Sequence, residues 1–318
     1  MIDTKTSALS DRVQWALAKC AEPIEPCGPD QWDLSLKNGS VLPCRATLND
    51  QWLHLDVDID QYRSTLQPNE HRAWSWLLRN GTLPSGVKYA LDAHSRLRIR
   101  AETPLPDDGH EFDLCGRIAT VWEGLEVASA AIHDPATNRG EQRSGIAWEK
   151  EGDRAACDLR RLCEEAGWPF TERAEEKLAV TLDASGDFWQ ALVERRTDGI
   201  RVAAPVGAPA MASDEVRNSI AVLLLTLNGV LRFARAAGDE QKGQVAAHLE
   251  ALLPHFPFAE ELGHALSAIS VGCRLCGREV EVLQNDLVIA REYLAVRGWS
   301  SPQPRKDRGS SCYKETGL

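Results

Sequence analysis

Two cysteines three residues apart, Cys273 and Cys276, are the clearest pair of chemically capable residues in this sequence. On a helix this spacing places both sulfurs on one face, where they can bind zinc or form a redox dithiol. Zinc needs four ligands, but there is no second pair of this kind, and the nearest upstream histidines are His255 and His264. The competing interpretation is that two small apolar side chains pack inward from a helix.

Three alternating aspartates, Asp56, Asp58 and Asp60, imitate the first ligands of a calcium-binding loop. Such a loop next requires a glycine and ends on a bidentate glutamate, but Gln61 and Gln67 occupy these positions. The apolar residues between the aspartates indicate a strand with one buried face. We therefore interpret the aspartates as the solvent-facing side of that strand.

Three arginines, Arg96, Arg98 and Arg100, alternate with apolar residues and should project from one outer face of a strand. Guanidinium groups arranged in this way can bind an acidic partner or a phosphate group. The alternative is a charged strand face that discourages pairing with another chain.

One tryptophan, Trp76, is a further candidate for partner binding. It follows Trp74 by two residues, and a two-residue step on a helix turns by ~200°. Because Trp74 shares a face with Leu77 and Leu78, Trp76 should be more exposed, and exposed aromatic residues often mark contact surfaces. A contact with a small secondary core is the alternative.

Enzyme and cofactor signatures are otherwise missing from the sequence. The eight histidines show no metal-binding spacing, and no nucleophile elbow, zinc-protease, phosphate-loop or dinucleotide motif occurs. A catalytic group assembled from distant residues would leave no such signature. We expect no catalytic site, no cofactor and no metal.

The composition narrows the possible partners. Lys and Arg number 36 against 47 Asp and Glu, a net charge of −11 that would repel nucleic acid. The longest apolar run, residues 220–225, is far shorter than the ~20 residues that cross a bilayer. The first 20 residues lack the apolar core of a secretory signal. Nine cysteines at irregular spacing are typical of reduced thiols, so we expect a cytoplasmic protein.

Hydrophobic periodicity and turn residues predict an α+β fold. In the first half we expect a short helix at 13–18 capped by Ser10, a three-strand antiparallel meander, a helix, two strands and a helix. The strands of the meander are 32–36, 42–48 and 53–59, and the helix after them is 69–79. The two strands that follow are 87–91 and 97–101, and the last helix is 111–131. The second half repeats this order with a helix at 159–166, strands at 178–182, 188–194 and 200–204, a helix at 213–227 capped by Ser213, strands at 231–236 and 244–249, and one or two helices in 258–294.

The two halves read as tandem repeats. Asn80-Gly81 falls 148 residues before Asn228-Gly229, and Glu102 falls 148 residues before Glu250. We expect both Asn-Gly pairs to end a helix, with positive φ at the glycine. The predicted division is a first repeat at 1–133, a linker at 134–153, a second repeat at 154–299 and a disordered tail at 300–318.

This order of elements resembles the fold of type III secretion chaperones and of YbjN-like proteins. The resemblance is carried by the meander at 32–59, the helix end at 74–81, the strand pair at 87–101 and the helix after Pro106. It is carried again by 178–204, 213–229, 231–249 and the helix after Pro254. It implies proteins that bind other proteins without catalysis and that form homodimers of a single copy.

A chain with two copies is expected to satisfy the dimer surface internally, as a monomer with pseudo-two-fold symmetry. We therefore predict a protein-binding module whose partner is another protein, with no nucleic acid or membrane partner. Sheet faces and edges would capture a strand or helix of that partner. The alternative is a metal-dependent or thiol-dependent sensor or enzyme that uses Cys273 and Cys276.

Overall fold

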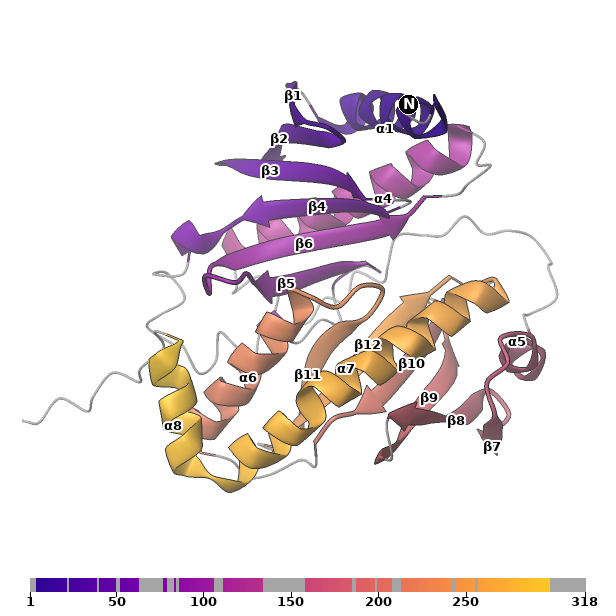
Figure 1. Ribbon diagram of the computed structural model, residues 1–318, viewed down its shortest axis with the longest axis vertical. Helices are drawn as coiled ribbons and strands as arrows, with labels where there is room; N and C mark the ends of the chain where they lie inside the picture. The colour runs from indigo at the N-terminus through magenta and orange to yellow at the C-terminus, as the bar shows by residue number, and fades with distance from the viewer. Residues whose placement is uncertain are drawn as a thin grey trace, which may run out of the picture.

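The fold is α+β, with two six-stranded antiparallel sheets and six helices in the described part of the chain (Figure 1). The computed structural model describes residues 4–21, 23–38, 40–49, 52–62, 77–78, 83, 86–105, 111–133, 158–184, 187–197, 199–207, 213–241, 244–254 and 257–297. The predicted linker and tail lie outside these residues, so the predicted domain boundaries stay a prediction. None of the described helices combines the length and apolar character that a membrane crossing needs.

The first sheet has the strand order β1-β2-β3-β4-β6-β5. One of its faces is apolar because alternate residues such as Leu53, Leu55 and Val57 point inward. Helix α4 covers this face, and α1 packs against α4. The elements are α1 (Thr4–Cys20), β1 (Ile24–Gly28), β2 (Gln31–Asn38), β3 (Ser40–Asn49), β4 (Trp52–Asp58), a short 3₁₀ helix η1 (Asp60–Tyr62), β5 (Val87–Leu91), β6 (Leu97–Pro104) and α4 (Glu111–His133).

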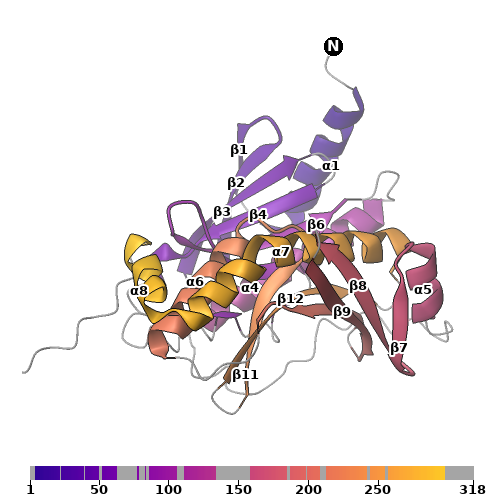
Figure 2. The ribbon, with the colours of Figure 1, turned by 60° about the horizontal axis from the view of Figure 1, so that its bottom comes forward.

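The second sheet has the strand order β11-β12-β10-β9-β8-β7. The long helix α7 covers one face, and Figure 2 shows it running across the strands. The elements are α5 (Leu159–Glu165), β7 (Phe170–Ala174), β8 (Lys177–Ala184), β9 (Asp187–Arg196), β10 (Gly199–Pro205), α6 (Asp214–Asn228), β11 (Arg235–Gln241), β12 (Gln244–Leu253), α7 (Ala259–Asn285) and α8 (Leu287–Val296).

Both sheets follow the same path along the chain. In each half the first four strands form a meander. The sixth strand then lies between the fourth and the fifth and pairs with both. The first strands, β1 and β7, were not predicted from the sequence, because neither shows apolar alternation. Each forms a hairpin whose register shifts, between Pro26 and Gly28 in β1 and between Glu172 and Ala174 in β7.

Two sequence-based expectations about helix ends change. Helix α1 already begins at Thr4, so Ser10 lies inside it and is not its cap, whereas Ser213 does cap α6. Gly229 ends α6 as predicted but has φ of −70°, in the right-handed region, so the expected positive φ is wrong. Gly81 lies outside the described residues.

One segment near the C-terminal part of the fold differs from expectation, and a second segment decides between two stated alternatives. Residues 231–234 were predicted to begin a strand, but β11 starts only at Arg235. Phe233 has φ of +63°, a conformation that breaks a strand, and its ring packs edge-on against Trp52 with centroids 5.4 Å apart. The segment 258–294 forms two helices, because Asp286 adopts extended backbone and caps α8 through its carboxylate.

The two halves share one connected hydrophobic core. Helix α6 of the second half packs against β5 at the edge of the first sheet, as well as against α7 and α8 (Figure 1). The edges β5 and β11 therefore lie at the contact between the halves, whereas β1 and β7 lie at the far ends of the two sheets.

Candidate functional site

A buried cation from the first half reaches into the second half. Lys88 lies on β5, faces away from α4 and is only 2% exposed. Its ammonium contacts the carboxylate of Glu102 on the neighbouring strand β6. The same ammonium donates to the backbone oxygens of Leu231 and Ala234, the latter at 3.2 Å. The charge of Lys88 is therefore paired with a carboxylate of its own half, and backbone oxygens of the other half accept its hydrogen bonds.

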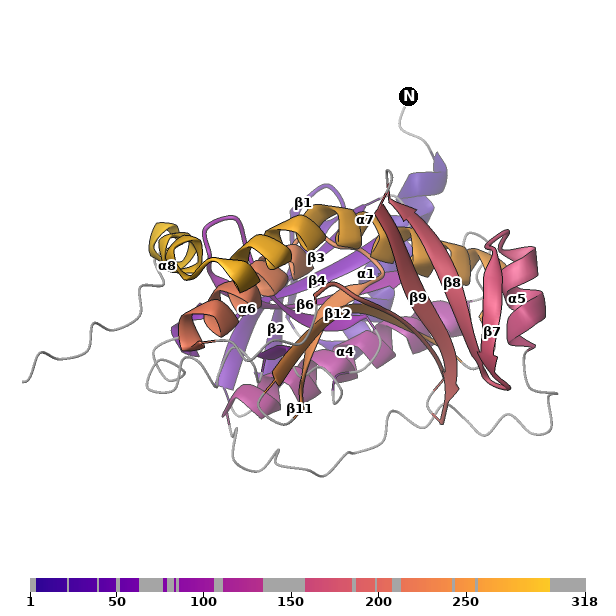
Figure 3. The ribbon, with the colours of Figure 1, turned by 90° about the horizontal axis from the view of Figure 1, so that it is seen from below.

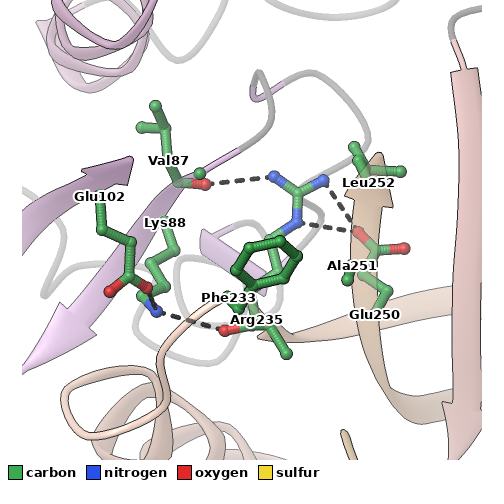
Figure 4. Close-up of a pocket in the computed structure, with 10 residues that line it drawn as sticks. Val87, Lys88, Glu102, Phe233, Arg235, Glu250, Ala251 and Leu252 are labelled. Carbon is green, nitrogen blue, oxygen red and sulfur yellow. Dashed lines mark hydrogen bonds and ion pairs between the residues drawn. The ribbon is translucent and has the colours of Figure 1, made fainter. Parts of the chain in front are cut away.

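Arg235 makes the reverse connection from β11. Its guanidinium binds the carboxylate of Glu250 on β12 at 2.8 Å. It also donates through Nη1 to the backbone oxygens of Leu83 and Val87, at 3.1 and 3.2 Å. Figure 4 shows both cations, each joined by dashed lines to a carboxylate and to a backbone oxygen. We call Lys88, Glu102, Arg235 and Glu250 the interface cluster.

The carboxylates of the interface cluster are held in their charged form. Burial disfavours the charge on Glu250, but Arg235, His248 and Arg201 outweigh it, so the pKa of this carboxyl lies well below its usual value. Burial likewise opposes ionisation of Glu102, and Lys88 together with His54 lowers the pKa of that carboxyl. A buried charge left without its partner destabilises a fold strongly, so each pair depends on both members.

A side-chain amide forms a second connection close to the interface cluster. Asn228, at the end of α6, is fully buried and donates through Nδ2 to the backbone oxygens of Tyr89 and Ala236. Its Oδ1 accepts from the amide of Ala236 at 2.6 Å. Asn228 therefore ties the end of α6 to an edge strand in each half.

The outer face of the first sheet, opposite α4, carries a row of alternating charges. Asp33, Arg45, Asp56 and Arg100 are direct neighbours across four strands. Arg45 binds Asp33 at 2.8 Å, and Arg100 binds Asp56 at 2.8 Å. Arg100 also donates to the backbone oxygen of Gly229 in the second half. The row thus ends at the contact between the halves.

The second sheet carries a matching row on the face opposite α7. Lys177 binds Glu194 at 3.2 Å, Glu194 binds Arg201 at 3.3 Å, and Arg201 binds Glu250 at 2.8 Å. Glu250 in turn binds Arg235 of the interface cluster. The charged rows of both sheets therefore meet at the contact between the halves, and the residues of each row form ion pairs within the chain.

The three predicted surface arginines are engaged by carboxylates of this chain. Arg96 and Arg98 both bind Asp92, at 2.9 and 3.0 Å, and Arg98 also approaches Asp58 at 3.6 Å. Arg100 belongs to the interface between the halves, as described above. All three arginines are therefore paired with carboxylates of this chain, and their role in binding a partner stays a prediction. The other partner-binding candidate, Trp76, lies outside the described residues.

Two of the three aspartates that imitate a calcium loop bind arginines, and the third stabilises backbone. Asp60 accepts from the amide of Leu97 at 3.0 Å, and its own amide donates to Asp58 at 3.1 Å. Among the described residues, no group of three or more His, Cys, Asp or Glu side chains is arranged to hold a metal.

Cys273 and Cys276 lie on the inner face of α7, buried in the core. Burial raises the pKa of each thiol to about 12. A thiolate is the reactive and metal-binding form, so both positions favour an inert thiol at neutral pH. The structure thus places the pair as the packing interpretation describes.

The space around the interface cluster does not offer room for a small-molecule ligand. The cavity there has a volume of about 20 Å³, enough for roughly one water molecule. The sequence pattern did not predict this cluster. Its one trace in the sequence is a lysine inside the otherwise apolar stretch 87–91. Only the structure shows that all five of these residues are buried.

The sequence matches no family model, and no curated protein matches it either.

Proposed function

We propose that this chain is a non-catalytic, cytoplasmic protein-binding module made of two chaperone-like halves that pair within one chain. The same strand order in both sheets supports two copies of one fold. The resemblance to type III secretion chaperones and YbjN-like proteins supplies the expectation that such copies pair and bind other proteins.

The observation that carries this proposal is the reciprocal exchange between Lys88 and Arg235. Each cation lies on the edge strand nearest the other half, binds a glutamate of its own sheet and donates to backbone oxygens across the contact. The two glutamates, Glu102 and Glu250, occupy equivalent positions 148 residues apart. At this offset Lys88 aligns with Ala236 and Arg235 aligns with Val87, so the two cations are one position out of register. The exchange between them resembles the pairing in a two-fold dimer without being fully symmetric.

A protein surface for the partner is available on α8. Its inner face holds Ala290 and Leu294 in the core, whereas Leu287, Val288 and Ile289 are exposed in succession, Val288 by 63%. Contiguous apolar residues on a surface typically mark a contact with another protein. We assign the partner to this surface, which we call the α8 patch.

The test is quantitative capture of the partner by the wild-type chain and by two matched variants. Val288→Asp places a charge in the α8 patch, and Val41→Asp makes the same change at an exposed valine on β3 of the first half. We expect a partner that co-purifies with wild type and with Val41→Asp, and at least about tenfold less of it with Val288→Asp. Equal recovery with both variants would remove the α8 patch from the proposal.

Internal pairing has its own test. A specific protease site inserted between residues 140 and 141 allows the linker to be cut in the folded protein. We expect the two fragments to co-elute after cleavage, because the contact between the halves is buried and its charges are paired. Arg235→Ala leaves Glu250 without a principal partner, so the fragments of this variant should separate more readily. Fragments of the wild type that separate at once would contradict internal pairing.

A further inference from the structure

Helix α7 carries a second row of apolar residues on the side that faces away from the core. Its inner face packs on the second sheet through buried residues such as Leu266, Ile269 and Val280. On the other side Val271, Leu275 and Val282 are exposed, Leu275 by 52%. We call these three residues the outer stripe. In Figure 3, α7 runs along the outer side of the second half, and no described element lies over it in Figure 1.

The spacing of the outer stripe is that of a helix-pairing seam. Steps of four, three and four residues separate Val271, Leu275, Arg278 and Val282, all of which are exposed. This alternation keeps side chains on one line along a helix and is the pattern that packs against a second helix. Helix α7 covers the second sheet and also packs against α5, α6 and α8. The outer stripe stays exposed beside all of these contacts. The outer stripe therefore indicates a further helix packed against α7.

The residues beside the outer stripe indicate which helix this is. Arg274 and Glu281 flank the seam on the same side, seven residues apart. If α7 packs against an antiparallel copy of itself about an axis between Cys276 and Gly277, Val271 meets Val282 of the second copy. Arg274 then lies near Glu281 of the second copy, and the pair is repeated by symmetry. In this register the charges beside the seam are complementary between the two copies.

A parallel arrangement is less favourable for a specific reason. It would place Arg278 against Arg278 of the second copy in the centre of the seam, where like charges repel. In the antiparallel arrangement Arg278 lies opposite Leu275, and its aliphatic stem can cover that side chain. We infer that α7 is an interface between two copies of this chain, paired antiparallel through the outer stripe.

This inference does not rest on the proposed function. The expectation of a monomer came from internal pairing, which buries the surface near β5, β11 and α6. The outer stripe lies on a different face of the second half, so internal pairing leaves it open. A dimer through α7 would contain four sheets, two from each chain.

Light scattering after size exclusion tests the interface on the full chain. Over a loading range of about 1 to 200 µM, the mass of the wild type should rise from 35.1 kDa towards twice that value. Leu275→Glu should weaken dimerisation by at least about tenfold. Because Leu275 is exposed, the variant should keep the thermal melting profile of the wild-type monomer. Val41→Glu, at an exposed valine of the first half, is the control and should dimerise like wild type.

A charge exchange tests the register. Arg274→Glu should weaken the dimer because Glu281 of the second copy then faces a like charge, and Arg274→Glu combined with Glu281→Arg should restore it. A mass that stays at 35.1 kDa at the highest concentration overturns the inference, as does a dimer that Leu275→Glu leaves intact. Failure of the double variant to restore dimerisation overturns the antiparallel register. Neither outcome affects the cleavage test of internal pairing.

Discussion

Asn228 in the second half donates through Nδ2 to the backbone oxygen of Tyr89 in the first half, at 2.9 Å. The two residues are 139 positions apart in sequence, and both are buried. Tyr89 faces the other way, with its hydroxyl donating to the backbone oxygen of Ala128 in α4. A single strand, β5, thus connects the helix that covers the first sheet to the helix that ends at Asn228.

Asn228→Ala should lower the free energy of unfolding by about 2–4 kcal/mol, because it removes the hydrogen bonds that this buried amide makes with the backbone of Tyr89 and Ala236. Asn285→Ala is the control, since the amide of Asn285 lies on the surface and bonds only within α7. It should cost less than about 0.5 kcal/mol. Urea denaturation monitored by tryptophan fluorescence measures both, and equal stability of the two variants would contradict the role of Asn228.

Two Gly→Ala substitutions should change stability in opposite directions. At Gly229 a Cβ would lie 2.5 Å from the backbone oxygen of Leu91, so Gly229→Ala forces the halves apart. We expect a loss of about 1–3 kcal/mol. At Gly263, inside α7, a Cβ meets nothing within 4 Å, and alanine favours helix by up to about 1 kcal/mol. Thermal melting should therefore fall for the first variant and rise for the second. A stabilised Gly229→Ala would show that the halves do not approach so closely.

Stability should decrease in acid, and Glu250 should account for part of the decrease. The folded pKa of this carboxyl is well below 4.5, the value for an unperturbed Glu, so the unfolded chain takes up the proton first. The stabilisation is complete above about pH 4.5 and is lost as the pH falls from there towards the folded pKa. Glu250→Gln should cost about 3 kcal/mol at pH 7 and should flatten the profile below pH 4.5.

Free energies of unfolding from pH 3 to 7 measure this effect. Glu172→Gln is the control at pH 7, because its pair with Arg160 is exposed and should contribute less than about 0.5 kcal/mol. An acid profile of Glu250→Gln that parallels wild type would show that Glu250 is not held in its charged form.

The thiols of Cys273 and Cys276 should resist alkylation in the folded protein. With pKa values of about 12 they are almost entirely neutral at pH 7.5, so they should react at least about a thousandfold more slowly than an exposed thiol. Cys27 on β1 is exposed and provides the comparison within the same chain. Peptide mapping after timed alkylation distinguishes the sites. Rapid labelling of either buried cysteine would favour the metal or thiol sensor instead.

Strands with one buried face could be predicted from the sequence, because alternation records the burial of each residue. The residues from Trp32 to Ile59 show this, as do those from Leu97 to Ala101. The short hairpin strands β1 and β7 could not, since most of their side chains are exposed and their pattern carries no period. The predicted strand 231–236 starts only at Arg235, after Phe233, whose contact with Trp52 is a tertiary feature that no local pattern contains.

The interface cluster depends on contacts between residues that are far apart along the chain. Lys88 belongs to the predicted strand 87–91, but nothing in the sequence says that the second half covers the face on which it lies. The arginine face was predicted correctly in its geometry, but the carboxylates of Asp92 and Asp56 that bind it come from a turn and from another strand. Spacing gives the direction of a side chain, whereas its partner depends on topology.

The irregular outer strands β1 and β7 also affect what the protein can do in concentrated solution. Each ends its sheet on the side away from the other half, and each has a shift of register in its pairing. In β1, Pro26 has no backbone N–H to offer. A strand from a second molecule would therefore meet a broken row of donors and acceptors at both ends. The two sheets can thus be long and hydrophobic without growing, strand by strand, into fibrils.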